Sequence, residues 1–358
     1  MTEHEQRRQT VAQGLAGHKI DVLLVSSPSN IRYLSGYSGS NGLMFVSAGE
    51  SHFFTDPRYR LAVSDMPGCA VHVVKGPLIP AASALLKRKK LKKIGIESSW
   101  ISYQDYIRLK DSLPLGSSLQ PVTGLVEALR MVKSLEEIGL IRKSVQVNSA
   151  AYSLTLKHVK AGMQEQEIAA ELDYQMRKLG AEKPAFDTIV AAGANSALPH
   201  AHPSAHRLIE NELLLTDMGA SLNGYSSDMT RVAYLGKPAR RVRALYRAVL
   251  EAQLSAVDAV RSGIEAGKVD RAARSVLKKH GLEREFVHST GHGLGLEIHE
   301  PPRIGRKEKT RLQAGMVITI EPGAYIDGFC GVRIEDTVLV TESGCEVLTP
   351  TSKELVSL

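Results

Sequence analysis

The sequence predicts an α/β domain over residues 1–124 followed by an α+β domain over residues 125–358, the second containing an internal pseudo-two-fold repeat. In the first part, short apolar runs typical of strands alternate with amphipathic helical patterns, which indicates a partly parallel sheet. Near residues 121–134 a Pro-Val-Thr-Gly run interrupts this alternation, and Ser134 with Glu137 forms a capping box that begins a long helix. Beyond that point, parts of the chain match each other at an offset of 101 residues.

The elements expected in the first domain follow from these patterns. Residues 28–42 are rich in Pro, Ser, Asn and Gly and are predicted as a loop that leads into a strand. Helices are predicted at residues 3–17, 57–66, 78–89 and 102–112, and strands at residues 20–25, 43–46, 51–54, 70–74 and 93–96.

The repeat lays residues 159–164 over residues 260–265, and at the same offset Gly180 meets Gly281. Each copy consists of a long helix, a glycine break, a second amphipathic helix and then strands. Such a duplication predicts a domain whose functional site lies at the junction between the halves.

Composition limits the class of protein. A chain of 358 residues that is 43% hydrophobic and 23% charged is ordinary for a globular protein with a large core. The three cysteines, Cys69, Cys330 and Cys345, show no CxxC spacing, which favours a reduced cytoplasm. The polar start has no signal-peptide pattern, and no apolar run approaches the roughly 20 residues that span a bilayer. We therefore expect a cytoplasmic protein that does not bind membranes.

The net charge of +7 first raises the question of nucleic acid binding. Six of the positive charges lie within residues 87–93, and removing them leaves +1 for the rest of the chain. This local run lacks interleaved aromatic residues and is typical of a solvated helix end. We expect no nucleic acid partner.

A glycine-rich segment over residues 286–303 contains three of the twelve histidines, His288, His292 and His299. Glycines at these positions let the backbone approach whatever the imidazoles face. The combination indicates a site rather than a core.

Four carboxylates stand in apolar strand patterns, where a charge costs several kcal/mol unless a partner compensates it. Asp217 ends one apolar run, Asp228 follows a turn, Glu321 ends a second apolar run, and Glu335 lies where charged and aliphatic residues alternate. One of the histidines together with these acids could hold two divalent cations, a recurring device for making water nucleophilic at neutral pH.

The order Asp217, Asp228, His292, Glu321, Glu335 resembles the metalloaminopeptidase family with the pita-bread fold, which includes methionine aminopeptidase, aminopeptidase P and prolidase. The resemblance covers about residues 125–345. Short motifs around the ligands resemble those of the Xaa-Pro branch of the family. They are NSALPH at 195–200, DMG at 217–219, GHG at 291–293, EPG at 321–323 and RIED at 333–336. Residues 28–46 are similar to the amino-terminal domain of creatinase, prolidase and aminopeptidase P. The resemblance implies a creatinase-like N-terminal domain over residues 1–124 and a pita-bread metallopeptidase domain over residues 125–358.

The same resemblance implies how the ligands divide. Asp217 chelates one metal ion, His292 and Glu321 bind the other, and Asp228 and Glu335 bridge the pair. A hydroxide held between the ions is the expected nucleophile, and Glu321 doubles as the proton shuttle.

Further histidines are expected to act on the substrate. By resemblance, His200 lies beside the substrate nitrogen, and His288 and His299 face the substrate, where they would stabilise the tetrahedral oxyanion. His202 and His206 match no such position and are expected to be surface loop residues.

Three residues are expected to bind substrate. Arg303 matches a carboxylate-binding arginine of some prolidases, and a guanidinium is suited to bidentate capture of a carboxylate. Arg333 lies two residues before Glu335 and is expected to brace it at the substrate cleft. The resemblance makes Tyr37 a candidate for lining the cleft, either its own or that of a partner subunit.

The resemblance therefore implies a metallopeptidase that removes an N-terminal residue preceding proline, from dipeptides or longer peptides, and that forms a homodimer. Manganese is the expected ion, with cobalt, zinc and iron as alternatives. Proline specificity comes from the resemblance alone.

The alternative functions are a creatinase-like hydrolase, a sulfonium lyase and a non-catalytic protein-binding module. An intact ligand set argues against the creatinase-like hydrolase and the binding module. Methionine aminopeptidase is disfavoured by the extra N-terminal domain.

Overall fold

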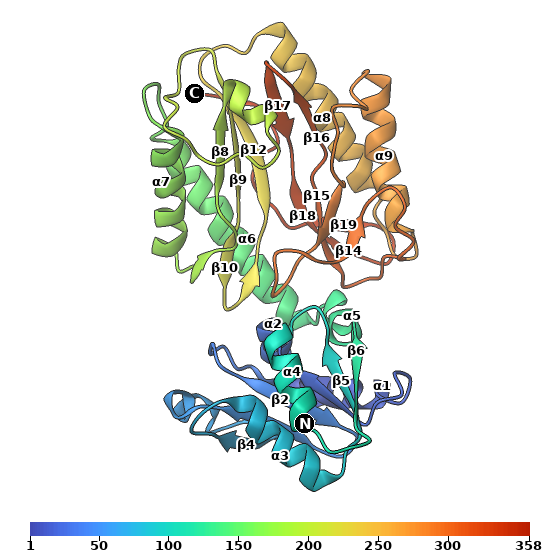
Figure 1. Cartoon of the computed structure of the whole chain (residues 1–358). Helices are drawn as coiled ribbons and strands as arrows, with labels where there is room; N and C mark the ends of the chain where they lie inside the picture. Colours follow the sequence, from blue (N-terminus) through green and yellow to red (C-terminus); the bar gives the residue numbers. More distant parts are fainter. The chain divides into compact units, whose positions relative to one another are not determined.

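The computed structural model describes residues 1–358 and divides into two compact units, Met1–Arg130 and Met131–Leu358. The division falls after residue 130 rather than after residue 124 because helix α5 (Leu125–Met131) is bonded into the first unit. The buried Arg130 donates to Asn30 Oδ1 at 2.8 Å, and Asn30 Nδ2 donates to Glu127 at 2.7 Å. Figure 1 shows the chain with its helices and strands labelled.

The first unit is a six-stranded mixed sheet in the order β4-β3-β2-β1-β5-β6. Strand β1 pairs in parallel with β5 and antiparallel with β2, so the sheet is partly parallel as the alternation of patterns predicts. Its strands are β1 (Val22–Val25), β2 (Leu43–Ser47), β3 (Ser51–Thr55), β4 (Ala70–Val73), β5 (Lys93–Glu97) and β6 (Ser118–Val122). Its other helices are α1 (Glu3–Gly14), α2 (Pro28–Ser35), α3 (Leu78–Lys89) and α4 (Tyr103–Ser112).

Two predictions for this unit were wrong. Residues 28–42 are not wholly a loop, because Pro28–Ser35 form α2. The turn formers act there as helix signals: Ser27 caps the start, and Gly36 ends the helix with φ of 77°. The helix predicted at residues 57–66 consists instead of the short 3₁₀ turns η1 (Pro57–Tyr59) and η2 (Leu61–Val63).

The second unit contains the predicted repeat. Helices α7 and α9 begin 101 residues apart and also end 101 residues apart, as the sequence match requires. The first half comprises α6 (Leu135–Leu156), α7 (Glu165–Lys178), β7 (Lys183–Pro184), β8 (Ile189–Ala192), η3 (Gly193–Ala197), β9 (Leu213–Met218), β10 (Ala220–Leu222), β11 (Tyr225–Ser226) and β12 (Met229–Tyr234). The second comprises α8 (Arg240–Ala259), α9 (Ala266–Lys279), β13 (Gly291–Gly293), β14 (Glu300–Ile304), β15 (Val317–Ile320), β16 (Gly323–Ile326), β17 (Cys330–Arg333), β18 (Asp336–Val340), β19 (Cys345–Val347) and β20 (Val356–Ser357).

Helices cover the sheets of both halves of this unit (Figure 1). The first half contributes β12, β9 and β8 of the sheet β20-β12-β9-β8, against which α6 and α7 bury a core that includes Ile168, Leu172 and Met218. The second half contributes the sheet β14-β13-β15-β18-β19, packed through a larger core with α8 and α9. None of the helices combines the length and the apolar character that crossing a bilayer requires.

Candidate active site

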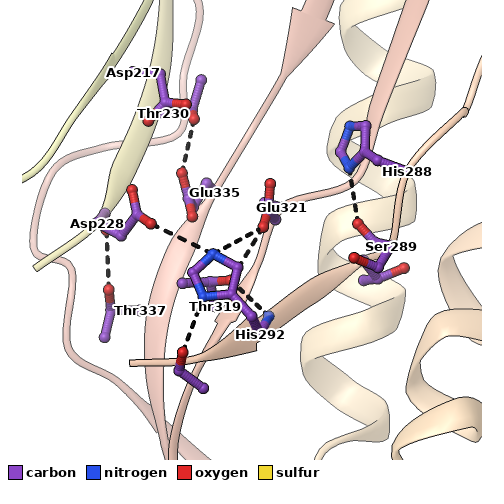
Figure 2. Close-up of polar contacts among 12 residues, drawn as sticks. Asp217, Asp228, Thr230, His288, Ser289, His292, Thr319, Glu321, Glu335 and Thr337 are labelled. Atoms are coloured by element: carbon purple, nitrogen blue, oxygen red, sulfur yellow. Dashed lines mark hydrogen bonds and ion pairs between the residues drawn. The ribbon is translucent and has the colours of Figure 1, made fainter. Parts of the chain in front are cut away.

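The structure brings the five predicted metal ligands to the junction of the two halves. Strand pairing sets Asp217 of β9 opposite Thr230 of β12, and Asp228 immediately precedes β12, so the two aspartates are diagonal rather than direct neighbours. The remaining three come from the second half, and Figure 2 shows Asp228, His292, Glu321 and Glu335 gathered together. His292 is the middle residue of β13, Glu321 follows β15, and Glu335 lies between β17 and β18.

The tautomer of His292 is fixed by the backbone. Its Nδ1 lies 3.0 Å from the carbonyl oxygen of Gly293, which can only accept, so Nδ1 carries the proton. Burial also lowers the pKa of His292, which favours the neutral ring. The unprotonated Nε2 therefore faces Asp228 Oδ2 at 3.6 Å and Glu321 Oε1 at 3.4 Å. The lone pair of Nε2 and the lone pairs of these carboxylate oxygens repel one another, and a cation bound between them would remove that repulsion.

The carboxylates are buried among like charges. Burial, and then the charges of Glu335 and Asp217, raises the pKa of Asp228 well above its ordinary value. Burial, and then the charge of Glu321, does the same for Glu335. Burial raises the pKa of Glu321 to about 7. Removing water from several carboxylates in one place is unfavourable unless positive charge is supplied.

The residues fit a divalent cation. Asp228, His292 and Glu335 offer ligand atoms that all lie within 4.8 Å of one another. Asp217 Oδ1 is buried without a hydrogen-bond partner, which leaves one carboxylate oxygen for a ligand. Carboxylate oxygens with one imidazole nitrogen suit several divalent first-row metals.

Arg333 of β17 holds one side of the site. Its Nη2 donates to Asp217 Oδ2 at 2.6 Å, and its Nε donates to Thr230 Oγ1 at 3.0 Å. Thr230 Oγ1 in turn donates to Glu335 Oε2 at 2.7 Å. Arg333 was expected to brace Glu335, but it reaches Asp217 directly and Glu335 only through a threonine hydroxyl.

Both ring nitrogens of His288 are already bonded, so its action on the substrate stays a prediction. Nδ1 donates to the carbonyl oxygen of Ser289 at 2.8 Å, and Nε2 accepts from Tyr325 Oη at 2.8 Å. Tyr325 Oη itself accepts from Arg333 Nη1 at 2.6 Å. Burial lowers the pKa of His288 to about 4, so the ring is neutral and has no N–H left for a substrate oxyanion.

A cavity of about 850 Å³ opens over the five predicted ligands. His200 and His299 line it with exposed rings, and the ring of His299 lies edge to face with that of His292, with centroids 4.4 Å apart. Arg303 lines it too, and cross-strand pairing sets Arg303 of β14 directly opposite His292 of β13. The guanidinium therefore projects from the sheet face that carries the imidazole.

Tyr37 packs within the first unit, where it is 5% exposed, and its place at a substrate cleft, its own or that of a partner subunit, stays a prediction. Its hydroxyl donates to the carbonyl oxygen of Asn41 at 3.0 Å, and its ring packs against Phe53 and Tyr59. A ring buried in this way has little surface to offer a substrate.

Comparison with known proteins places the chain in a family. The model of the metallopeptidase family M24 matches residues 139–342, and the model of the creatinase/prolidase N-terminal domain matches residues 7–132.

The chain belongs to metallopeptidase family M24.

Relatives match this M24 peptidase over nearly its whole length. It is 38% identical to the Xaa-Pro dipeptidase of Pyrococcus furiosus over 354 residues, which cover 98% of this chain and 100% of that protein. The structure of an Xaa-Pro dipeptidase from Bacillus anthracis superposes with a TM-score of 0.96 at 35% identity, covering 99% of this chain and 100% of that one. An X-Pro aminopeptidase from Thermotoga maritima gives a TM-score of 0.89 at 34% identity, with coverage of 95% and 98%. The predicted fold class, an α/β N-terminal domain followed by an α+β pita-bread catalytic domain with an internal repeat, is confirmed.

Several residues of the M24 site were not predicted from sequence. Thr230 links the predicted ligand Glu335 to Arg333, and Tyr325 connects Arg333 to His288. Thr230 could have been found from the sequence, because it is a polar residue on the strand that follows Asp228. Tyr325 could not, because a single tyrosine in a strand pattern does not indicate a functional site. His202 lies on an exposed loop as expected, and that loop also lines the cavity, whereas His206 pairs with Glu212 at 3.0 Å.

Proposed function

We propose that this M24 peptidase is an Xaa-Pro dipeptidase that uses two divalent metal ions, manganese in the first instance, to hydrolyse the bond between an N-terminal residue and proline. The observation that carries the proposal is the unprotonated His292 Nε2 set among buried carboxylates beneath a cavity lined by His200, His299 and Arg303. The printed names of the relatives from Pyrococcus furiosus and Bacillus anthracis support the choice of substrate.

The predicted ligand roles form part of the proposal. Asp217 would hold one ion through Oδ1, the oxygen that Arg333 leaves unbonded. His292 and Glu321 would hold the other, with Asp228 and Glu335 shared between the two. Bound divalent ions supply Lewis acidity, which polarises the scissile carbonyl and makes a water nucleophilic near neutral pH.

The chain's own groups then perform the remaining tasks. Glu321, at the cavity wall, accepts the proton of the attacking water and returns it to the leaving proline nitrogen. His200 and His299 donate to the substrate from the cavity wall, a contribution of about 2.7 to 4 kcal/mol per oxyanion donor in studied enzymes. His288, which also lines the cavity, instead orients Tyr325 and through it Arg333, the partner of Asp217.

Arg303 would select the dipeptide. A guanidinium at the cavity wall, opposite His292 across the strand pair, can capture the free carboxylate of a proline that occupies the leaving position. A longer peptide lacks a carboxylate at this point. Dipeptides are therefore the proposed substrates, and cleavage of longer peptides is the competing outcome.

The proposal is tested with a matched pair of substrates, Ala-Pro and Ala-Pro-Ala-Ala, given to metal-stripped protein resupplied with manganese. We expect hydrolysis of the dipeptide and slow or no hydrolysis of the tetrapeptide. Efficient cleavage of the tetrapeptide would instead make the protein an aminopeptidase P. Inactivity on both peptides would favour the creatinase-like hydrolase or the sulfonium lyase.

We further propose a homodimer in a reducing compartment, the cytoplasm. The three cysteines Cys69, Cys330 and Cys345 are free thiols, which supports the choice of compartment. Sedimentation velocity at micromolar concentration is the test of assembly, and a profile with monomer alone would refute the dimer.

A further inference from the structure

A buried ion pair lies beside the cavity but belongs to none of the predicted ligands. Lys133 Nζ lies 3.2 Å from Glu300 Oε2, and the two side chains are 1% and 2% exposed. Glu300 begins β14 and directly follows His299 in the chain. Removing one partner of such a pair leaves the other charge buried without compensation, which is strongly unfavourable. The pair is therefore a rigid anchor next to a cavity histidine.

The connection between β13 and β14 folds around the Glu300 carboxylate. The backbone N–H of Glu297 donates to Glu300 Oε1 at 3.1 Å. A Cβ at Gly295 would lie 2.7 Å from Oε1 and 2.8 Å from Oε2, so glycine alone lets the backbone pass this close. The loop contacts one side of the carboxylate, and the ammonium of Lys133 contacts the other.

Lys133 is itself fixed by the backbone on which it stands. Its N–H donates to the carbonyl oxygen of Gly315 at 3.0 Å, and the adjacent Val132 forms an antiparallel bridge with Met316. Met316 directly precedes β15, the strand that ends at the proposed ligand Glu321. The backbone that carries the Lys133 ammonium is therefore bonded next to the strand that leads to the proposed ligand Glu321.

The two histidines at the ends of this connection are held differently. His292 is fixed within β13, where its N–H donates to Thr319 Oγ1 at 3.1 Å and its Nδ1 donates to Gly293. His299 precedes its strand, and its ring is exposed to the cavity. The residue that follows it is Glu300, the partner of Lys133.

We propose that Lys133 and Glu300 form a positioning pair for His299, which acts on hydrolysis through that imidazole and without touching the substrate. The proposal rests on the proposed peptidase function for its kinetic readout. Neutralising Lys133 takes its ammonium away from Glu300, loosens the loop and displaces His299. The ligand His292, held by its own strand, keeps its place.

A double-mutant cycle tests this coupling with Ala-Pro as substrate and manganese in excess. We expect K133M to lower kcat by about 10-fold or more while KM changes less than about threefold, since loss of an oxyanion donor reduces kcat by about 100-fold or more. K133R, which retains the charge, restores most of the rate. In an H299A background, K133M has less than about a threefold further effect, because the group through which it acts is already gone. Equal effects of K133M in both backgrounds would overturn the proposal.

A second measurement is independent of catalysis. Hydrogen exchange of residues 294–300 in metal-free protein should be faster in K133M and in E300Q than in the wild type, with β15 unchanged. Ile168, buried in α7 within the core of the first half, provides the control: I168A lowers Tm without selective exchange in the loop. Unchanged loop exchange in both K133M and E300Q refutes the positioning role. Wild-type inactivity on Ala-Pro would count against the proposed function alone, because the exchange experiment needs no turnover.

Discussion

Metal removal should make the stability of this protein fall as pH rises, and Glu321 allows the size of the effect to be worked out. Burial raises the pKa of this carboxyl from 4.5 to about 7 in the metal-free site. At about 1.4 kcal/mol per pKa unit, the difference corresponds to about 3 kcal/mol. Asp228 and Glu335, whose pKa values are raised by the same burial, act in the same direction.

The sign follows from the order of the two pKa values. The folded value lies above the unfolded one, so folding favours the protonated carboxyl. The contribution of Glu321 to stability is fully present below pH 4.5 and is lost as pH rises through about 7. Manganese should reverse the trend, because a bound cation favours the charged carboxylate.

The assay is urea unfolding of EDTA-treated protein between pH 5 and 8, comparing the wild type with E321Q. The glutamine cannot ionise, so E321Q should become more stable relative to the wild type as pH rises, by up to about 3 kcal/mol. E342Q, at an exposed position between β18 and β19, is the matched control and should follow the wild type. Parallel pH profiles for the wild type and E321Q would refute the reasoning.

Three further predictions concern single side chains. D228N should retain the fold by circular dichroism but lose at least about 100-fold in kcat/KM at fixed manganese, because a bridging carboxylate is lost; a loss below about tenfold would remove Asp228 from the ligand set. R303M should raise KM for Ala-Pro by about 10- to 100-fold and leave Ala-Pro amide unaffected, since a charge-assisted bond contributes about 1.5 to 3 kcal/mol; equal effects on both substrates would contradict carboxylate capture. Y325F removes the hydroxyl between Arg333 and His288 and should lower the free energy of unfolding by about 1 to 3 kcal/mol, measured by urea titration; an unchanged value would mean that the bonded chain contributes nothing to stability.

The match between residues 159–164 and residues 260–265 illustrates what local pattern can predict. Helix starts, glycine breaks and apolar periodicity depend on near neighbours in the chain, so both copies were recognisable and their helices formed where expected. Asp217 and Glu321 could be recognised as site candidates for a related reason. A charged side chain at the end of an apolar strand is unfavourable for folding, and such departures from the local rules concentrate at functional sites.

For two predicted site residues, the contacts made on folding bear on the prediction. Tyr37 was predicted to line a cleft, and its ring packs against Phe53 and Tyr59. His288 looked like a substrate donor, but Tyr325 and the carbonyl oxygen of Ser289 occupy both of its nitrogens. No local pattern reports which partners a side chain will meet after folding.

The sequence by itself determined the two-domain architecture, the duplicated catalytic half and the residue types able to hold divalent ions, because periodicity and chemical type belong to short stretches of chain. Only the tertiary structure decided which of those residues face one another. It set Arg333 against Asp217, turned the unprotonated Nε2 of His292 toward buried carboxylates, and joined Lys133 to Glu300 across 167 positions of sequence. Burial and charge are properties of the assembled fold, and so the pKa of Glu321 and the positioning of His299 could be argued only from it.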